Sequence, residues 1–460
     1  MLVFLLVFLS ACEVYPARDQ AGIPDMAAVS ADKAKQGIQY CAVFVADHIV
    51  DIYYKPWMLS ETALTLLISG EHKKARAVLD KAYNIALGLD NPSYKADAML
   101  EVAKGYSRIK EYKKAVAIAD AIEAVIPRIK TYAAVALNYY DGGKAVEARE
   151  LLDRTAMWVE NDLKKDLSDR ALGKLAETYI SVGETDSALD LADKISGNAA
   201  RARILVKVSE AYLKVNNKEK ALFALSEAEK TVLTVEDPLE GPVISAGIAV
   251  VYSGMGEKSR SGEFLKRAYG DAMAIRSKYS KPEVLSRVSA SCLKSGFRDM
   301  ALDVAYSIGD DNYGPRALAE AAVFCEDKSE AEKVLSDALK AVEDIRSRYS
   351  QASVMFDITK SYVRLGDPGR ALEIAGEMQD DYNKPRALAM IANEYAMNGD
   401  KAAAYRIFDA SLEVAGMIED NFYKSWALAY ISDKFAASGL SVDERIKKAL
   451  VRIVDATVAK

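Results

Sequence analysis

Three acidic pairs are the first residues in this sequence whose types could do chemistry. Asp310-Asp311 and Asp380-Asp381 recur in similar surroundings, and Glu419-Asp420 follows them in EDNFYKSWAL. Two carboxyl groups that face each other across a substrate can act as general acid and base, as in glycoside hydrolysis. Each pair, however, precedes a predicted helix, where a carboxylate accepts hydrogen bonds from free N–H groups and complements the helix dipole. The sequence therefore favours helix capping here, and no catalytic residue is predicted.

Other reactive residue types are scarce. The two histidines, His48 and His72, are too few for most histidine-based metal sites or a catalytic triad, so no metal site is predicted. The last three of the four cysteines are too scattered for a disulfide framework and are interpreted as free thiols. The segment GMGEKSRSG (254–262) is interpreted as a plain turn, because no Lys directly follows its glycine and no strand precedes it. No cofactor is predicted.

A recurrent basic residue is the main candidate for binding. It occurs nine residues before a repeated aromatic or apolar position, and we call these residues the basic series: Lys130, Arg170, Arg203, Arg316 and Arg386. Their charged groups could bind the carboxylates of a peptide through charge-assisted hydrogen bonds. The alternative is that they form ion pairs with Asp and Glu of neighbouring units.

The repeated position belongs to a pattern that runs through most of the chain. Its members, here called anchors, follow one another at intervals of 33 or 40 residues with one interval of 37: Leu66, Tyr106, Tyr139, Tyr179, Tyr212, Tyr252, Cys292, Cys325, Tyr362, Tyr395 and Phe435. A small residue generally precedes the anchor by three positions, glycine commonly follows it by four, and a second small residue usually follows by nine. Glycine tolerates the left-handed conformation that ends a helix. Each unit is therefore predicted to be a helix, a tight turn and a second helix, with the small residues allowing close approach.

The spacing resembles that of the tetratricopeptide repeat over about residues 55–460. The best matches are VAKGYSRIKEYKKAVAIA (102–119), LAETYISVGETDSALDLA (175–192) and ITKSYVRLGDPGRALEIA (358–375). The resemblance implies an all-α fold, an α-solenoid of about eleven antiparallel helical hairpins, with the basic series on first helices that face a concave groove. Two departures from the family are the near-absence of its early Trp and the alternation of 33 with 40 residues. Because seven residues are about two helical turns, the longer units can extend a helix without turning its apolar face away from the core.

The N-terminus resembles a bacterial lipoprotein signal. The apolar run from 2 to 9 is shorter than the roughly 20 residues that span a bilayer, but it fits the core of a secretory signal. Leu9-Ser10-Ala11-Cys12 resembles the lipobox, although no Lys or Arg precedes the run. We therefore predict a signal peptide over 1–12 with Cys12 as the lipid attachment site, and a flexible tether over 13–30.

The remainder is predicted to be a capping helix over 31–54 and the repeat array over 55–460, which ends in a C-terminal capping helix. The predicted function is a non-catalytic scaffold that binds a protein or peptide partner in its concave groove and assembles an envelope complex. Glu13 after the lipobox indicates an outer-membrane lipoprotein that faces the periplasm and contacts the membrane through its lipid alone. With a net charge of −6 and no basic stripe, nucleic-acid binding is not predicted.

Two alternatives stay open at this point. One is a cytoplasmic repeat-based interaction protein without lipid. The other is an α/α-toroid enzyme that acts on polysaccharide, for which paired carboxylates and aromatic platforms at one rim would be needed. An open-ended count of units, and three Trp at unrelated positions (Trp57, Trp158 and Trp426), argue against the toroid.

Overall fold

The computed structural model describes residues 29–380 and 382–459, and all regular secondary structure in them is helical. Cys12, the predicted signal peptide and nearly all of the predicted tether lie outside the described residues. The helices are α1 (Ala31–Ala34), α2 (Ile38–Asp47), α3 (Lys55–Ile68), α4 (His72–Leu87), α5 (Pro92–Arg108), α6 (Tyr112–Asp120), α7 (Val125–Asp141), α8 (Ala145–Asp162), α9 (Lys165–Ser181), α10 (Thr185–Lys194), α11 (Asn198–Lys214), α12 (Lys218–Val232), α13 (Glu240–Gly254), α14 (Lys258–Met273), α15 (Ser280–Lys294), α16 (Arg298–Tyr306), α17 (Tyr313–Ala322), α18 (Lys328–Val342), α19 (Arg348–Arg364), α20 (Pro368–Glu377), α21 (Asn383–Met397), α22 (Lys401–Met417), α23 (Asn421–Ala437) and α24 (Glu444–Val458). The predicted all-α class is confirmed.

From α3 to α22 the chain forms ten consecutive helical hairpins, as the repeat pattern predicts. In most units the first helix ends in a specific turn shortly after the anchor residue. In the turn after α13, Gly256 has a φ of 87°, and the N–H of Glu257 donates to the anchor carbonyl of Tyr252 at 2.9 Å. The same bond joins Asp400 to Tyr395 at 2.9 Å. This is the geometry that satisfies the last carbonyls of a helix, and it confirms that GMGEKSRSG is a turn.

The small residues on both sides of the turn lie where two helices of a hairpin touch. Ala136 and Ala148 are both fully buried, and so are the corresponding alanines of most other units. Where one of the pair is serine, its hydroxyl donates across the interface, as Ser209 does to the carbonyl of Ala221 at 2.7 Å. The two unit lengths also have a direct cause: the 40-residue interval contains α4 with 16 residues, and the 33-residue interval contains α6 with 9. The seven extra residues lengthen the second helix.

Several anchor tyrosines also connect their unit to the one before it. The hydroxyl of Tyr106 on α5 donates to the Asp80 carboxylate on α4 at 2.5 Å, and Lys114 on α6 reaches the same carboxylate at 2.6 Å. The hydroxyl of Tyr179 on α9 likewise donates to Asp153 on α8 at 2.6 Å. A buried hydroxyl needs a partner, so the recurrent Tyr fixes the register between neighbouring units as well as filling the core.

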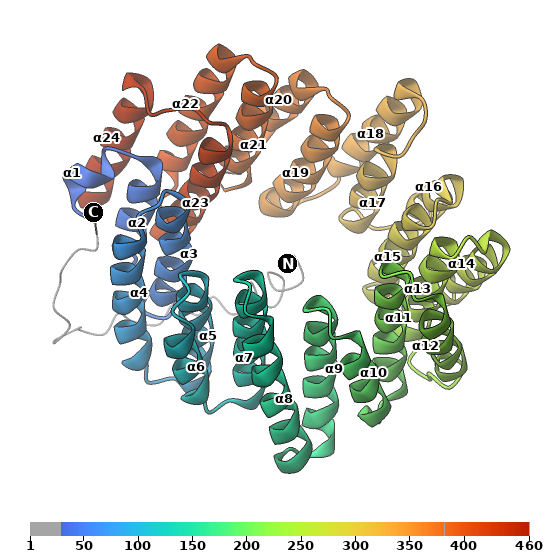
Figure 1. The fold of residues 1–460 in the computed structure, drawn as a ribbon. Helices are drawn as coiled ribbons and strands as arrows, with labels where there is room; N and C mark the ends of the chain where they lie inside the picture. The colour runs from blue at the N-terminus through green and yellow to red at the C-terminus, as the bar shows by residue number, and fades with distance from the viewer. Residues whose placement is uncertain (1–28, 381, 460) are drawn as a thin grey trace.

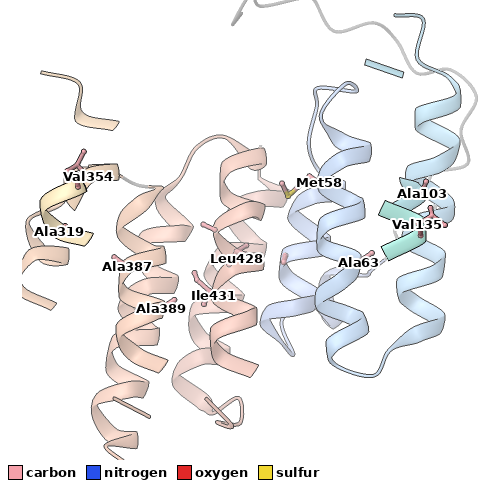
Figure 2. Packing of buried hydrophobic residues seen from close by; sticks show 14 of the residues in the cluster. Met58, Ala63, Ala103, Val135, Ala319, Val354, Ala387, Ala389, Leu428 and Ile431 are labelled. Carbon is pink, nitrogen blue, oxygen red and sulfur yellow. The ribbon is translucent and has the colours of Figure 1, made fainter. Parts of the chain in front are cut away.

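The array closes into a ring (Figure 1). The eleven first helices, α3, α5, α7 and so on to α23, form the inner layer, where each contacts the next, and α23 contacts α3. Figure 2 shows this continuity: buried residues on α21 (Ala387, Ala389), α23 (Leu428, Ile431) and α3 (Met58, Ala63) lie in one series across the junction. The expectation of an open-ended array is therefore wrong.

An N-terminal helix completes the last unit of the ring. Helix α2 packs against α23 and α3, in the position that the second helix of a hairpin takes elsewhere, whereas α24 packs mainly on α22 and α2. The side-chain amide of Asn421 on α23 donates to the carbonyl of His48 at 2.9 Å, and Lys35 pairs with Asp455 on α24 at 2.8 Å. The segment over 31–54 contains two helices, α1 and α2, in place of the single predicted one, and it occupies the junction between the first and last units. We call this junction the seam.

Candidate binding surface on the inner face of the ring

Four positions of each first helix form the surface that faces the centre of the ring. They lie nine, five and two residues before the anchor and two residues after it, a spacing that places them on one face of a helix. On α11 they include Arg203, Lys207 and Lys214, which are exposed, whereas Leu205 and Val208 between them are buried. Because the buried side chains face the outer helices, the exposed ones face the centre, and we call this surface the inner face.

The ring encloses an opening. Eleven helices in contact at about 8–10 Å between axes place those axes on a circle about 30 Å across. Subtracting one helix diameter with its side chains, about 10–12 Å, leaves an opening of about 20 Å. An α-helix of another protein fits through an opening of this width.

The inner face is more basic than the chain as a whole. Among the inner-face positions that lie within the first helices, fourteen are basic residues: Lys104, Arg108, Lys130, Arg170, Lys174, Arg203, Lys207, Lys214, Arg287, Lys294, Arg316, Lys360, Arg364 and Arg386. Ten of these positions are acidic residues: Glu61, Asp97, Glu101, Asp141, Glu177, Glu210, Glu283, Glu320, Asp357 and Asp433. The inner face thus has an excess of positive charge within a chain whose net charge is −6, which favours acidic partners inside the ring.

All five members of the basic series lie on the inner face, but they do not form one continuous ladder. Lys130, Arg170 and Arg203 lie on the neighbouring helices α7, α9 and α11, and Arg316 and Arg386 lie on α17 and α21 in another part of the ring. Burial lowers the pKa of the Lys130 ammonium. The neighbouring cations Arg170, Lys104 and Lys174 lower this pKa further, whereas the carboxylate of Asp97 raises it. Clustered like charges of this kind favour an anion nearby.

Two members of the basic series are engaged in ion pairs with neighbouring units. Arg203 Nη1 lies 3.1 Å from Glu240 Oε1 on α13, and Arg316 pairs with the Asp357 carboxylate on α19. Arg316 also donates to the Ser353 hydroxyl at 2.9 Å. These contacts are the inter-repeat pairing that the sequence left as the alternative to binding.

Arg386 is engaged differently, with aromatic rings. Its guanidinium lies 4.9 Å from the ring centres of Phe356 and Tyr382 and 5.0 Å from that of Tyr430. Three such contacts on one cation, each worth about 0.5–2 kcal/mol, hold α19, α21 and α23 together. Arg386 is thus a structural residue of the ring.

The acidic pairs cap helices, as predicted. Asp310 Oδ1 accepts from the N–H groups of Asn312 and Tyr313 at 2.9 and 2.8 Å, at the start of α17. Asp420 Oδ1 accepts from Phe422 and Tyr423 at 2.7 and 3.3 Å, at the start of α23. Asp380 does the same before α21, whereas Asp381 is not described.

An aromatic cluster at the seam was missed by the sequence reasoning. The ring centres of Trp57 on α3 and Trp426 on α23 are 6.0 Å apart, and Phe422 lies 5.3 Å from Trp57. Tyr382 extends the cluster, 5.0 Å from Trp426. The view that the three Trp occupy unrelated positions is wrong for two of them, because Trp57 and Trp426 both lie nine residues before an anchor, in the first and last units. Their shared position in the repeat could have predicted that the two Trp side chains lie on the same face of the ring. Trp158 lies on the outer helix α8.

Two shallow pockets open on the inner face. One, of about 320 Å³, lies between α7, α9 and α11 and is lined by Lys174, Lys207 and Lys214 among others. The other, of about 360 Å³, lies at the C-terminal ends of α3, α5 and α7 and is lined by Leu64, Ile68 and Arg108 among others. Both are open hollows whose charged lining is mainly basic, so neither resembles an enclosed acidic cleft.

Between residues 29 and 459, with residue 381 left aside, no helix is both long and apolar enough to cross a membrane. Over the same part of the chain, no group of three or more His, Cys, Asp or Glu side chains could hold a metal ion.

The fold and its inner face define a helical repeat protein of the tetratricopeptide-like kind, closed into a ring. No family model matches the chain, and no curated protein matches it. Among solved structures, Ton1535 from Thermococcus onnurineus is 17% identical over 72% of this chain and 98% of its own, with a TM-score of 0.30. A Rap protein complexed with competence and sporulation factor is 14% identical over 74% of this chain and 99% of its own, with a TM-score of 0.32. At such scores nothing about the shape or function of this chain follows from these likenesses.

Proposed function

We propose that this protein is a non-catalytic scaffold whose inner face binds a segment of a partner protein. The observation that carries the proposal is the row of exposed side chains on the first helices. These side chains are not needed to pack one unit on the next, and in a repeat array such a surface grows with every unit. The excess of basic residues on the inner face supports a partner segment that is rich in Asp and Glu.

The proposal includes the lipid anchor that the N-terminal sequence predicts. Cys12 precedes α1 by fewer than twenty residues, so a lipid on it would hold the ring close to a membrane surface. Labelling cells with a palmitate analogue, in wild type beside Cys12→Ser, tests the anchor. Labelling of the wild type alone supports an envelope lipoprotein; equal labelling of both would leave the cytoplasmic alternative.

Affinity capture with matched charge-reversal variants tests the scaffold. Arg170 and Lys214 are exposed on the inner face, so Arg170→Glu/Lys214→Glu changes the surface with little effect on packing. Arg316 and Arg386 are unsuitable for this purpose because their substitution would loosen the ring itself. Lys218→Glu/Lys266→Glu on the outer helices α12 and α14 is the control, since it changes net charge by the same amount.

The expected result is that tagged wild type and the outer variant capture the same proteins from envelope extracts, and the inner variant loses at least one of them. If the inner variant captures every protein that the wild type does, at equal yield, the inner face is not the binding surface.

A second candidate function is that of an α/α-toroid enzyme acting on polysaccharide, favoured by ring closure and by the aromatic cluster at the seam. Glu61 and Asp97 are carboxyl groups of the inner face on α3 and α5, and burial raises the pKa of each. The neighbouring Glu101 also raises these pKa values, whereas nearby cations lower them. Glu101 itself is paired with Lys104 at 2.6 Å. Release of reducing ends from envelope polysaccharides by wild type, but not by Glu61→Gln, would favour the enzyme over the scaffold.

A further inference from the structure

The inner face is divided into sectors of different chemistry. On α9 and α11, seven of the eight inner-face positions are charged. The helices α21, α23 and α3 are consecutive across the seam and together have twelve inner-face positions. Only three of these positions are charged, Arg386, Glu61 and Asp433. We call the inner face of these three helices the seam surface.

The seam surface exposes apolar side chains that the fold leaves uncovered. Near the N-terminal ends of the three helices its apolar residues include the half-buried aromatic residues Trp57, Trp426 and Tyr430. Near the C-terminal ends its apolar residues are aliphatic; Ile68 is 59% exposed and Met397 is 71% exposed, and the polar residues Asn393 and Asp433 interrupt them. Exposed apolar side chains grouped in this way are typical of an interaction site.

Near the C-terminal ends of the helices, basic residues flank this apolar strip on both sides. Lys360 and Arg364 lie on the inner face of α19, next to α21, and are exposed. Within the described residues, neither forms an ion pair with the chain. On the other side, Arg108 on α5 is exposed and borders the pocket of about 360 Å³ that Leu64 and Ile68 line. A hollow with an aliphatic wall and a guanidinium at its edge suits a large apolar side chain next to a carboxylate.

We propose that the seam surface is the docking site for an acidic amphipathic helix of a partner protein. The proposal rests on the scaffold function and names the class of its partner. The apolar stripe of the helix lies on Trp57, Trp426, Ile68 and Met397, and one of its apolar side chains enters the pocket beside Arg108. Its carboxylates face Lys360 and Arg364 on one side and Arg108 on the other.

Width and charge both favour this occupant. An opening of about 20 Å admits a helix of about 10–12 Å, and a helix presents an apolar stripe with charged residues on both sides, which is the arrangement of the seam surface. The basic residues on α9 and α11 lie across the ring, four and five helices from α23, and attract the remaining carboxylates of the helix.

The test uses an 18-residue synthetic peptide with Leu at helical spacing on one face and Glu elsewhere, labelled with fluorescein. Binding to the full protein is followed by fluorescence anisotropy. In the Trp158→Phe background, emission from Trp57 and Trp426 reports contact at the seam. We expect saturable binding, a shift of the Trp emission, and affinity that falls as salt rises.

Substitutions then locate the peptide. Lys360→Glu/Arg364→Glu should weaken binding about tenfold or more, because attraction becomes repulsion, and Ile68→Ser should weaken it several-fold. The matched controls, Lys218→Glu/Lys266→Glu for charge and Val146→Ser for an exposed apolar residue on α8, should leave affinity unchanged.

Three results would overturn the proposal: equal binding of the peptide with Lys in place of Glu, displacement of the peptide by a proline-rich peptide or an oligosaccharide, and unchanged affinity in the seam variants. If the peptide fails while Arg170→Glu/Lys214→Glu still loses captured proteins, the seam proposal falls and the scaffold stands. If that capture is also unaffected, both fall.

Discussion

Because α2 joins α23 without being its neighbour in sequence, removing one buried side chain from α2 should open the ring at the seam. Phe44 is a large side chain on α2 that is 4% exposed, and α2 packs against α3, α23 and α24. Phe→Ala in a well-packed core costs about 3–5 kcal/mol. If the loss falls on the seam alone, the population of open rings rises about 10²- to 4 × 10³-fold, since each 1.4 kcal/mol is a factor of ten.

Two buried cysteines provide the assay. Cys41 on α2 and Cys292 on α15 are both 0% exposed, and burial raises the pKa of each thiol to about 12. Neither thiol therefore reacts in the closed ring, and alkylation proceeds through opening. In Cys12→Ser protein, labelling by iodoacetamide is followed at each site by mass spectrometry. We expect Phe44→Ala to accelerate Cys41 about 100-fold or more and to leave Cys292 close to its wild-type rate.

A crossed control excludes a general loss of stability. Leu265 on α14 is fully buried in the unit that packs on α15, so Leu265→Ala should accelerate Cys292 and leave Cys41 nearly unchanged. Equal acceleration of both cysteines by Phe44→Ala would refute the reasoning, since it would mean that the ring opens only by unfolding as a whole.

Three smaller predictions concern stability. Lys110 adopts a φ of 66° at a turn position where most other units have glycine, so Lys110→Gly should raise stability by up to about 1 kcal/mol, measured as a higher urea midpoint. Asp420→Ala removes the cap of α23 and should lower stability by about 1 kcal/mol in the same assay. Burial raises the pKa of the Glu61 carboxyl, so ionisation of Glu61 reduces stability as pH rises above its unfolded pKa of about 4.3. Glu61→Gln should therefore raise the thermal midpoint at pH 7, and the gain should vanish below pH 4.

The hairpins could be predicted because one local constraint recurs. The first helix must end in a left-handed residue and must pack closely on the second helix of the same hairpin. These two requirements determine the spacing between Tyr252, Gly256 and Ser261 in the sequence. The hydroxyl of Ser261 donates to the carbonyl of Ala249 at 2.8 Å. The serine that replaces alanine at this position therefore also lies where the two helices of the hairpin touch. Contacts within a unit leave such a trace in sequence because they join residues a few turns apart.

Ring closure could not be predicted in the same way, because it depends on the sum of small rotations between units. One feature of the sequence does indicate ring closure once the structure is known. Nine residues after the last anchor, Phe435, the chain has Glu444, where nine of the other ten units have alanine or serine. A helix with glutamate at that position cannot approach α23 closely, and α2 supplies Cys41, Ala42 and Ala46 in its place, all fully buried. This departure from the repeat pattern indicates the unit whose second helix, α2, comes from the other end of the array.

Closure also determines how a partner can reach the inner face. A helix with a free end can thread through an opening of about 20 Å. A helix flanked by folded domains on both sides cannot, because a domain of 100 residues has a radius of gyration of about 13 Å. Such a partner enters only while the seam is open, so its association rate follows the population of open rings, and Phe44→Ala accelerates it by the same factor as the labelling of Cys41. A partner with a free end associates at a rate that Phe44→Ala leaves unchanged. The ratio of the two rates therefore tells which kind of segment the ring holds.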